Sequence, residues 1–493
     1  MKTTKLIRYL GSLTPEELKS LERFINSRFF NRNKSILKLF EYLKTSKFKF
    51  ELLYHRKEEI YRYITGKSDF RNQKIHNLYS DTIKLIELFF SVKRFISNEK
   101  EVSINLLSEI LGRNLTSDYH TMFRKYEKEF IRVTDNDIEN LYYKIKILSL
   151  NHESKQWDYL YKNNRLTENK EIIENLNKIL DYLHKFYNLF RFKLYSDIRM
   201  YELLNNEGQF DKESSLNDLG LNSLELSNCS YLTRIYLNLF KVYQKNVPNK
   251  YFDEILTMLD KYRNEIKPTV IFEIYTKLEN YCIFMIQAGN DEYIPILFNL
   301  YNKSFELKDL QYVEPMIFIN AVTTAINLNK LDWAYDFNEK FRTKVFPQES
   351  ENAYYLNRAK ICFYLKNYDE CLEFLNKVKL NNIFIKLVSK SLYIMVFYEL
   401  NDVERFEHAI DAFRHFLKRN KLVPNNMRIM GYKFINYSAK LMKAKINNDS
   451  YGIDTIELEI INSITANKKW LLDKINEIKA FSTLYRKQMY PTS

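Results

Sequence analysis

The sequence predicts an all-α protein: an α-solenoid of helical hairpins that follows an N-terminal helical module. Only 8 Gly and 8 Pro occur in 493 residues, so the chain has few places for the tight turns of a strand-rich fold. Apolar residues recur at helical spacing instead, as in the run from Ile172 to Leu183. Single cores stop growing beyond about 250 to 300 residues, so a chain this long with 45% hydrophobic residues favours several domains or an elongated repeat array.

Residues 1–100 are predicted to form a helical module with readable ends. Thr14-Pro15-Glu16-Glu17 is a capping box with proline at the first helical position, so a helix should run from there to Asn26. Gly66 is a natural C-terminal cap, and Ser68 or Asp69 a natural N-cap for the helix that follows. Further helices are expected over residues 34–43, 56–65 and 70–96.

This module is strongly basic. It contains 22 Lys plus Arg against 11 Asp plus Glu, whereas the remaining 393 residues hold 54 against 51. Such asymmetry indicates an anionic partner such as nucleic acid, an acidic protein face or a membrane surface. A helix-turn-helix drawn around Gly66 has Arg62, Lys67, Arg71 and Lys74 near its turn. With Lys84, these are the five candidate anion or nucleic-acid contacts. The competing interpretation is a compact helical cap with a solvated basic face.

Polar breaks organise the rest of the chain. Residues 101–204 are predicted to form a first helical-hairpin segment of four or five helices, in which 141–150 and 156–161 pair. Residues 205–228 are rich in Asn and Ser and read as a polar loop or linker. Residues 229–493 are expected to form the solenoid, closed by C-terminal helices near 456–463 and 468–489.

The stretch from Ala359 to Phe374 carries the hairpin prediction. Small residues at Ala359 and Cys371 allow two helices to approach closely, while Leu365, Tyr368 and Leu372 are expected to fill the wedge beside them. The pattern recurs upstream at Leu328 with the small residue Ala334, and downstream at Leu400 with the large Phe406 in that place. Leu328, Leu365 and Leu400 lie 37 and 35 residues apart.

This spacing over about residues 315–420 resembles the tetratricopeptide family, whose repeat is about 34 residues. The resemblance implies a stack of helical hairpins. A second resemblance comes from the segments 13–21, 24–33, 39–43 and 77–86, which are similar to the opening of large uncharacterised proteins common in Bacteroidota. It implies a bacterial, cytoplasmic protein and transfers no functional residue.

Motifs for chemistry are missing from the sequence. There is no GxxxxGK, GxGxxG after a strand, GxSxG or HExxH, so we expect no enzymatic activity and no cofactor. His408, Asp411 and His415 share one face of a predicted helix, but a metal site needs further ligands, and we expect a surface role. The four cysteines lack CxxC spacing and are expected to be reduced thiols of a cytoplasmic protein without a transmembrane segment.

The expected function is a non-enzymatic scaffold for a protein or peptide partner. The alternative is a nucleic-acid-associated regulator whose basic module holds DNA or RNA, and a structural or envelope-associated assembly factor is a third class. Aromatic and basic residues also alternate between Phe186 and Tyr195, where they could stack on bases, although aromatics at helical spacing more often pack between hairpins. Partner identity and oligomeric state are left open.

Overall fold

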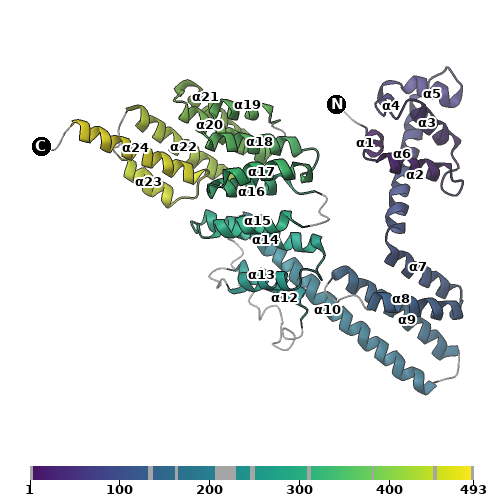
Figure 1. Cartoon of the computed structure of the whole chain (residues 1–493). Helices are drawn as coiled ribbons and strands as arrows, with labels where there is room; N and C mark the ends of the chain where they lie inside the picture. The colour runs from purple at the N-terminus through teal and green to yellow at the C-terminus, as the bar shows by residue number, and fades with distance from the viewer. Residues whose placement is uncertain are drawn as a thin grey trace. The chain divides into compact units, whose positions relative to one another are not determined.

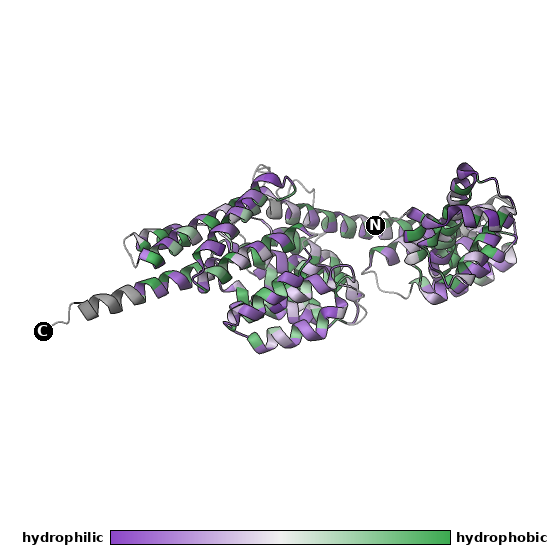
Figure 2. Cartoon of the chain, turned by 90° about the horizontal axis from the view of Figure 1, so that it is seen from above, coloured by the Kyte–Doolittle hydropathy of each residue, from purple (hydrophilic) through white to green (hydrophobic). Residues whose placement is uncertain are grey.

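The computed structural model describes residues 4–131, 137–161, 165–205, 229–244, 250–307, 312–379, 382–447 and 452–489. These described residues form helices and no strand, with an isolated bridge between Val313 and Val345, so the all-α prediction is confirmed. Hydrophobic and hydrophilic residues alternate along the helices, as amphipathic packing requires (Figure 2). Among the described helices, none has a stretch long and apolar enough to cross a membrane. The predicted loop at 205–228 lies outside the described residues, except for Asn205.

The chain divides into two compact units. Unit 1 comprises residues 1–133 and 142–180, and unit 2 comprises residues 134–141 and 181–493. The division falls inside two helices, α9 (Ile138–Tyr161) and α10 (Arg165–Asn205). The sequence analysis placed its boundaries after residues 100, 204 and 228. Composition does not show where one long helix passes from one core to another.

In unit 1, six helices form the N-terminal module: α1 (Lys5–Gly11), α2 (Pro15–Asn26), α3 (Lys34–Thr45), α4 (Leu52–His55), α5 (Lys57–Thr65) and α6 (Asn72–Ile96). Helices α1, α2, α3 and α5 pack against α6 (Figure 1). They enclose a separate apolar cluster that includes Leu21, Ile60 and Ile86. The module therefore has a hydrophobic core of its own.

The caps of this module follow the sequence in part. Thr14 Oγ1 accepts the backbone N–H of Glu17 at 3.2 Å, and Glu17 Oε2 accepts that of Thr14 at 2.8 Å, which confirms the capping box. Gly66 ends α5 in the left-handed conformation, with φ of 69°. The prediction that Ser68 or Asp69 caps the start of α6 is wrong. The N-cap is Arg71, which makes no side-chain hydrogen bond to the helix. The segment between the two helices is longer than predicted, and Asp69 pairs with Arg71 instead.

The remainder of unit 1 contains α7 (Glu99–Gly112), α8 (Thr116–Ile131), most of α9 and the start of α10. The predicted break between 150 and 156 is wrong, because α9 runs through it as one helix and no Gly or Pro interrupts it there. Asn151 Nδ2 donates to Asn175 Oδ1 at 3.2 Å, and Asn175 Nδ2 donates to the Leu148 carbonyl at 2.9 Å. This buried link joins α9 to α10.

Unit 2 is a succession of helix pairs (Figure 1). Helices α12 and α13, α14 and α15, α16 and α17, α18 and α19, and α20 and α21 pack as consecutive pairs, and α16 also packs on α18, α18 on α20, and α20 on α22. The bounds are α12 (Tyr231–Val242), α13 (Lys250–Lys261), α14 (Pro268–Gln287), α15 (Tyr293–Phe305), α16 (Pro315–Asn327), α17 (Leu331–Phe341), a 3-10 turn (Arg342–Lys344), α18 (Ser350–Tyr364), α19 (Tyr368–Lys377), α20 (Ile383–Glu399), α21 (Val403–Arg419), α22 (Asn425–Asn447), α23 (Ile453–Ile461) and α24 (Lys468–Met489).

Three of these pairs share one turn. The residue after each turn leucine is left-handed, at Asn329, Lys366 and Asn401, with φ of 57°, 62° and 54°. The next N–H then reaches back to a carbonyl in the last turn of the first helix, which satisfies it as in a Schellman cap. These bonds are Lys330 N to Ala325 O at 2.9 Å, Asn367 N to Cys362 O at 2.9 Å, and Asp402 N to Phe397 O at 3.0 Å.

The small residues of the pairs are deeply buried. Ala334 on α17, Ala359 on α18 and Cys371 on α19 are 0% exposed, and Phe406 on α21 is 2% exposed. The expected wedge role of Leu365 is wrong, since its side chain is 58% exposed at the helix end. The reason is that the left-handed residue after it reverses the chain and leaves this position facing solvent, while Tyr368 and Leu372 pack against the core. None of the four cysteines, which all lie among the described residues, forms a disulfide, and Cys282, Cys362 and Cys371 are buried.

Candidate binding surfaces and a buried ionic cluster

The five candidate basic residues lie on two helices and the segment between them, and three have acidic neighbours. Arg62 lies 3.9 Å from Glu58, Arg71 lies 3.3 Å from Asp69, and Lys84 lies 3.7 Å from Asp81. Lys74 and Lys84 are ten residues apart on α6, which at about 100° per residue places them roughly 80° apart around the helix. Local carboxylates therefore accompany three of the five candidate charges, while the module keeps the excess of its 22 basic over its 11 acidic residues.

A surface cavity of about 700 Å³ lies beside Arg62 in unit 1. Its lining carries charges of both signs. Two ion pairs form between lining residues: Arg56 lies 3.1 Å from Glu59, and Arg62 lies 3.9 Å from Glu58. The cavity has room for a small polar group. Its lining residues are Tyr54, His55, Arg56, Lys57, Glu58, Glu59, Arg62, Phe70 and Asn72.

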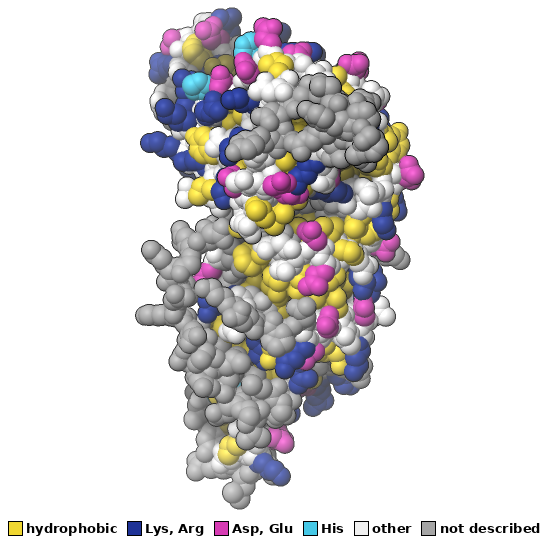
Figure 3. Space-filling view, turned by 90° about the vertical axis from the view of Figure 1, so that its left-hand side faces the viewer, with side chains coloured by type: hydrophobic (Ala, Val, Ile, Leu, Met, Phe, Trp, Pro, Cys, Tyr) yellow, Lys and Arg dark blue, Asp and Glu magenta, His cyan; other side chains and the backbone are white. Residues whose placement is uncertain are grey.

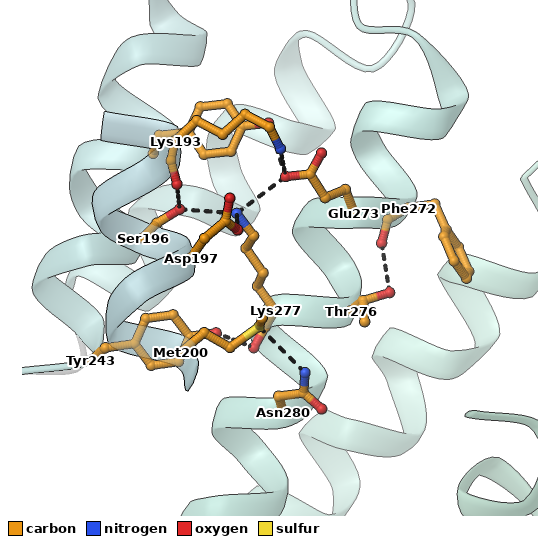
Figure 4. Close-up of polar contacts among 11 residues, drawn as sticks. Lys193, Ser196, Asp197, Met200, Tyr243, Phe272, Glu273, Thr276, Lys277 and Asn280 are labelled. Atoms are coloured by element: carbon orange, nitrogen blue, oxygen red, sulfur yellow. Dashed lines mark hydrogen bonds and ion pairs between the residues drawn. The ribbon is translucent and has the colours of Figure 1, made fainter. Parts of the chain in front are cut away.

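Unit 2 contains an ionic cluster that the sequence analysis missed (Figure 4). At its centre is Lys277 of α14, whose side chain is 3% exposed and whose Nζ lies 2.6 Å from Asp197 Oδ1 and 3.1 Å from Glu273 Oε1. The same ammonium donates to Ser196 Oγ at 2.9 Å. A lysine with so little solvent keeps its charge only when carboxylates and hydrogen-bond acceptors surround it.

A second lysine and an aromatic ring complete this cluster. Lys193 of α10 pairs with Glu273, and the ring of Tyr236 lies 5.4 Å from Lys193 Nζ and 5.0 Å from Lys277 Nζ. Burial would raise the pKa of Glu273, but the hydrogen bonds and charges of Lys193 and Lys277 lower it below its ordinary value. Two cations facing two carboxylates form a neutral set that fastens α10 to α14, which is a structural role.

The sequence held one signal for this cluster. Lys277 lies between Tyr275 and Leu278 on the buried face of α14, and Glu273 precedes it by four residues, a spacing that brings both side chains to one side of a helix. The carboxylate of Asp197 lies 80 residues earlier in the chain, so no local pattern could have named it.

Two single titratable groups in unit 2 have shifted pKa values. Burial raises the pKa of Glu279 on α14 to about 8, and its Oε1 has no hydrogen-bond partner. Burial lowers the pKa of Lys360 on α18 to about 8, and its Nζ donates to Thr323 Oγ1 at 2.6 Å. They belong to different helix pairs, Glu279 to α14 with α15 and Lys360 to α18 with α19.

The histidine candidates lie on the surface. His408, Asp411 and His415 are exposed on α21, and Asp411 pairs with Arg414 at 2.7 Å. In the part of the chain that the structure describes, no group of three His, Cys, Asp or Glu side chains is placed to hold a metal ion. On the face seen in Figure 3, Lys and Arg side chains are interspersed with Asp and Glu.

The aromatic and basic run on α10 is divided between two faces. Phe192 is buried, and Phe186 and Tyr195 pack against the core, as the packing interpretation predicted. Tyr187 and Phe190 are instead 56% and 41% exposed. The run therefore does not form one continuous groove for stacked bases.

Comparison with family models, with curated proteins and with solved structures returned no match for this chain.

Proposed function

We propose that this chain is a non-enzymatic scaffold that binds a protein or peptide through a tetratricopeptide-like solenoid. The observation that carries the proposal is the repeated helix pair. Three pairs share the same left-handed turn at intervals of 37 and 35 residues, and the first helix of one pair packs on the first helix of the next. Such stacking creates an extended surface whose side chains come from successive repeats.

The row of first helices supplies side chains suited to contact with another protein. On α20, Lys386, Lys390, Tyr393 and Phe397 recur at helical spacing and are all half-buried. The Tyr393 hydroxyl donates to Asn376 of α19, and Lys390 Nζ lies 5.6 Å from the Phe416 ring of α21. Half-buried aromatic rings and lysine stems offer apolar area with polar tips, which is the composition that protein interfaces favour. Because residues 101–493 carry a net charge of only +3, recognition by shape and apolar contact is expected to dominate.

The nucleic-acid regulator remains the competing function, and the local pairing of Arg62, Arg71 and Lys84 weighs against it. Exposed charges already paired with carboxylates release fewer counterions when they meet a phosphate backbone. Binding to nucleic acid should therefore stay in the non-specific range, roughly 10⁻⁴ to 10⁻⁶ M at physiological salt.

Affinity capture from native-host extract with the full chain tests the proposal. We expect one protein to be retained after a wash at about 0.5 M salt, where screening shortens the reach of exposed charges to a few ångströms. A Lys390→Glu/Tyr393→Ala variant should lose that protein, whereas Arg71→Glu/Lys74→Glu should retain it. Recovery of nucleic acid that is lost in the wash, and lost again in the Arg71/Lys74 variant, would instead establish the regulator.

A further inference from the structure

Helix α10 carries an exposed apolar stripe along its half in unit 2. Six large side chains with exposures from 41% to 61% follow one another at intervals of three or four residues. No other helix among the described residues exposes as many large hydrophobic side chains as α10. The six residues of the stripe are Leu183, Tyr187, Phe190, Leu194, Ile198 and Tyr201.

The stripe is not the face by which α10 joins its own core. At about 100° per residue, the six positions fall within an arc of roughly 80°. Leu189, Phe192 and Ser196 point to the opposite side and are buried. The ionic cluster around Lys277 fastens that buried side to α14, so the helix presents the stripe from a fixed position.

We propose that the stripe binds the same stripe of a second copy of this chain, with the two α10 helices antiparallel about a two-fold axis near residue 192. In this arrangement Leu183 faces Tyr201 of the other copy, and Phe190 faces Leu194. Tyr187 faces Ile198 in the same way. Every contact then joins one aromatic ring to one aliphatic side chain, and the surface is complementary to itself, as a two-fold interface requires.

A parallel arrangement lacks this complementarity. With the helices in register, Tyr187 would meet Tyr187 and Phe190 would meet Phe190, so the bulkiest side chains would coincide. Each leucine of the stripe would likewise meet only its own copy. Packing that alternates large and small side chains fills space at lower strain. The spacing of three and four residues also suits two helices that cross at a shallow angle.

The exposed area sets the strength of the dimer. An aromatic side chain buries roughly 150 to 250 Å² in full, so the half-exposed rings and aliphatic chains of the stripe together offer roughly 500 Å² per copy. Stable complexes bury about 1,200 to 2,000 Å² in total, and weaker ones less. The six residues from two copies together bury roughly 1,000 Å², which is below that range and predicts a weak, reversible dimer in the micromolar range.

The charges beside the stripe oppose this association. Arg191 of both copies lies at the level of the axis, next to the ring of Tyr187 at 4.8 Å. The chain as a whole carries a net charge of +14. Because salt screens like charges, rising salt should strengthen the dimer, which is the reverse of its effect on nucleic-acid binding.

Sedimentation velocity of the full chain between about 1 and 100 µM measures the association, over the range expected for small reversible interfaces. We expect a monomer–dimer equilibrium that Leu194→Glu weakens at least tenfold, because one change places two carboxylates against Phe190 rings. Leu458→Glu is the matched control, since Leu458 is 60% exposed on α23 outside the stripe. Its association should equal that of the unaltered chain, and far-UV circular dichroism should show equal helicity in all three.

Cross-linking fixes the direction of the helices. In the antiparallel dimer, a Leu183→Cys chain mixed with a Tyr201→Cys chain should form a disulfide between copies under mild oxidation. Two Leu183→Cys chains should not, because their cysteines would lie about 27 Å apart along the helices. A strictly monomeric chain at about 100 µM overturns the proposal, as does a dimer that Leu194→Glu leaves unchanged or a Leu183→Cys chain that links to itself.

Discussion

The N-terminal module and unit 2 use their charged side chains in opposite ways. In the module, the pairs of Arg62 with Glu58 and Lys84 with Asp81 lie at the surface, with all four side chains more than half exposed. In unit 2, Lys277 and Lys474 are 3% and 9% exposed and pair with carboxylates drawn from other helices. These buried ion pairs thus lie in the region with little net charge. The net charge of a region indicates how much charge faces solvent, and it does not reveal the ion pairs that hold helices together.

Loss of the buried lysine should have the largest effect. Lys277→Met leaves Asp197 and Glu273 with fewer partners in a site of low solvent access, and should reduce the free energy of unfolding of unit 2 by about 3 kcal/mol. Hydrogen exchange of the α14 amides measures this change within unit 2. The matched control in the module is Lys84→Met, where a 73% exposed side chain should give no measurable change. Equal effects at both positions would erase the contrast between the regions.

Glu279 gives a pH dependence that the module should not show. Its pKa is raised by burial to about 8 in the folded chain, from an ordinary value of 4.5. The folded state therefore keeps a proton that the unfolded state has lost, and stability should fall as the pH rises from about 4.5 to about 8. Glu279→Gln should remove this slope and stabilise unit 2 by up to about 3 kcal/mol at pH 7. We would measure denaturation of both proteins at a series of pH values. An equal dependence of stability on pH in the two proteins would contradict the raised pKa of this buried carboxyl.

The helix pairs should resist enlargement of their small residues. Ala334→Leu and Cys371→Phe each add volume at a fully buried position and should cost about 1 to 3 kcal/mol. Leu365→Phe is the control, because the Leu365 side chain is 58% exposed at the end of α18. Melting temperatures that stay unchanged for both buried variants would show that the pairs meet at other residues.

The smallest expected effects come from one helical glycine in each unit. A Cβ at Gly431 would lie 2.9 Å from Leu417 Cδ1, whereas a Cβ at Gly112 would have no neighbouring atom within 4 Å. Gly112→Ala should therefore stabilise unit 1 by about 0.5 kcal/mol through the lower entropy of the unfolded chain. At Gly431 the same gain is offset by the contact with Leu417, so Gly431→Ala should be neutral or destabilising by about 1 kcal/mol. A stabilised Gly431→Ala variant in chemical denaturation would show that Leu417 moves aside freely.

The sequence by itself determined features that depend on a few adjacent residues. The cap at Thr14 and the helix that follows it to Asn26, the left-handed end at Gly66, and the last helix from Lys468 to Met489 were all predicted and observed. The turn leucines marked three equivalent helix ends for the same reason. Capping and periodicity act over one or two helical turns, so the local sequence contains all the information that they need.

Only the tertiary structure decided which faces of those helices meet. The sequence named the five basic residues of the module but not the carboxylates beside them. It also did not indicate the contact of Lys277 with Asp197, because these two residues are 80 positions apart in the chain. It also could not tell that Leu194 faces solvent while Leu189 is buried, since both are leucines on one amphipathic helix. Burial and ion pairing depend on how distant segments pack, and a helical period is compatible with more than one choice of buried face.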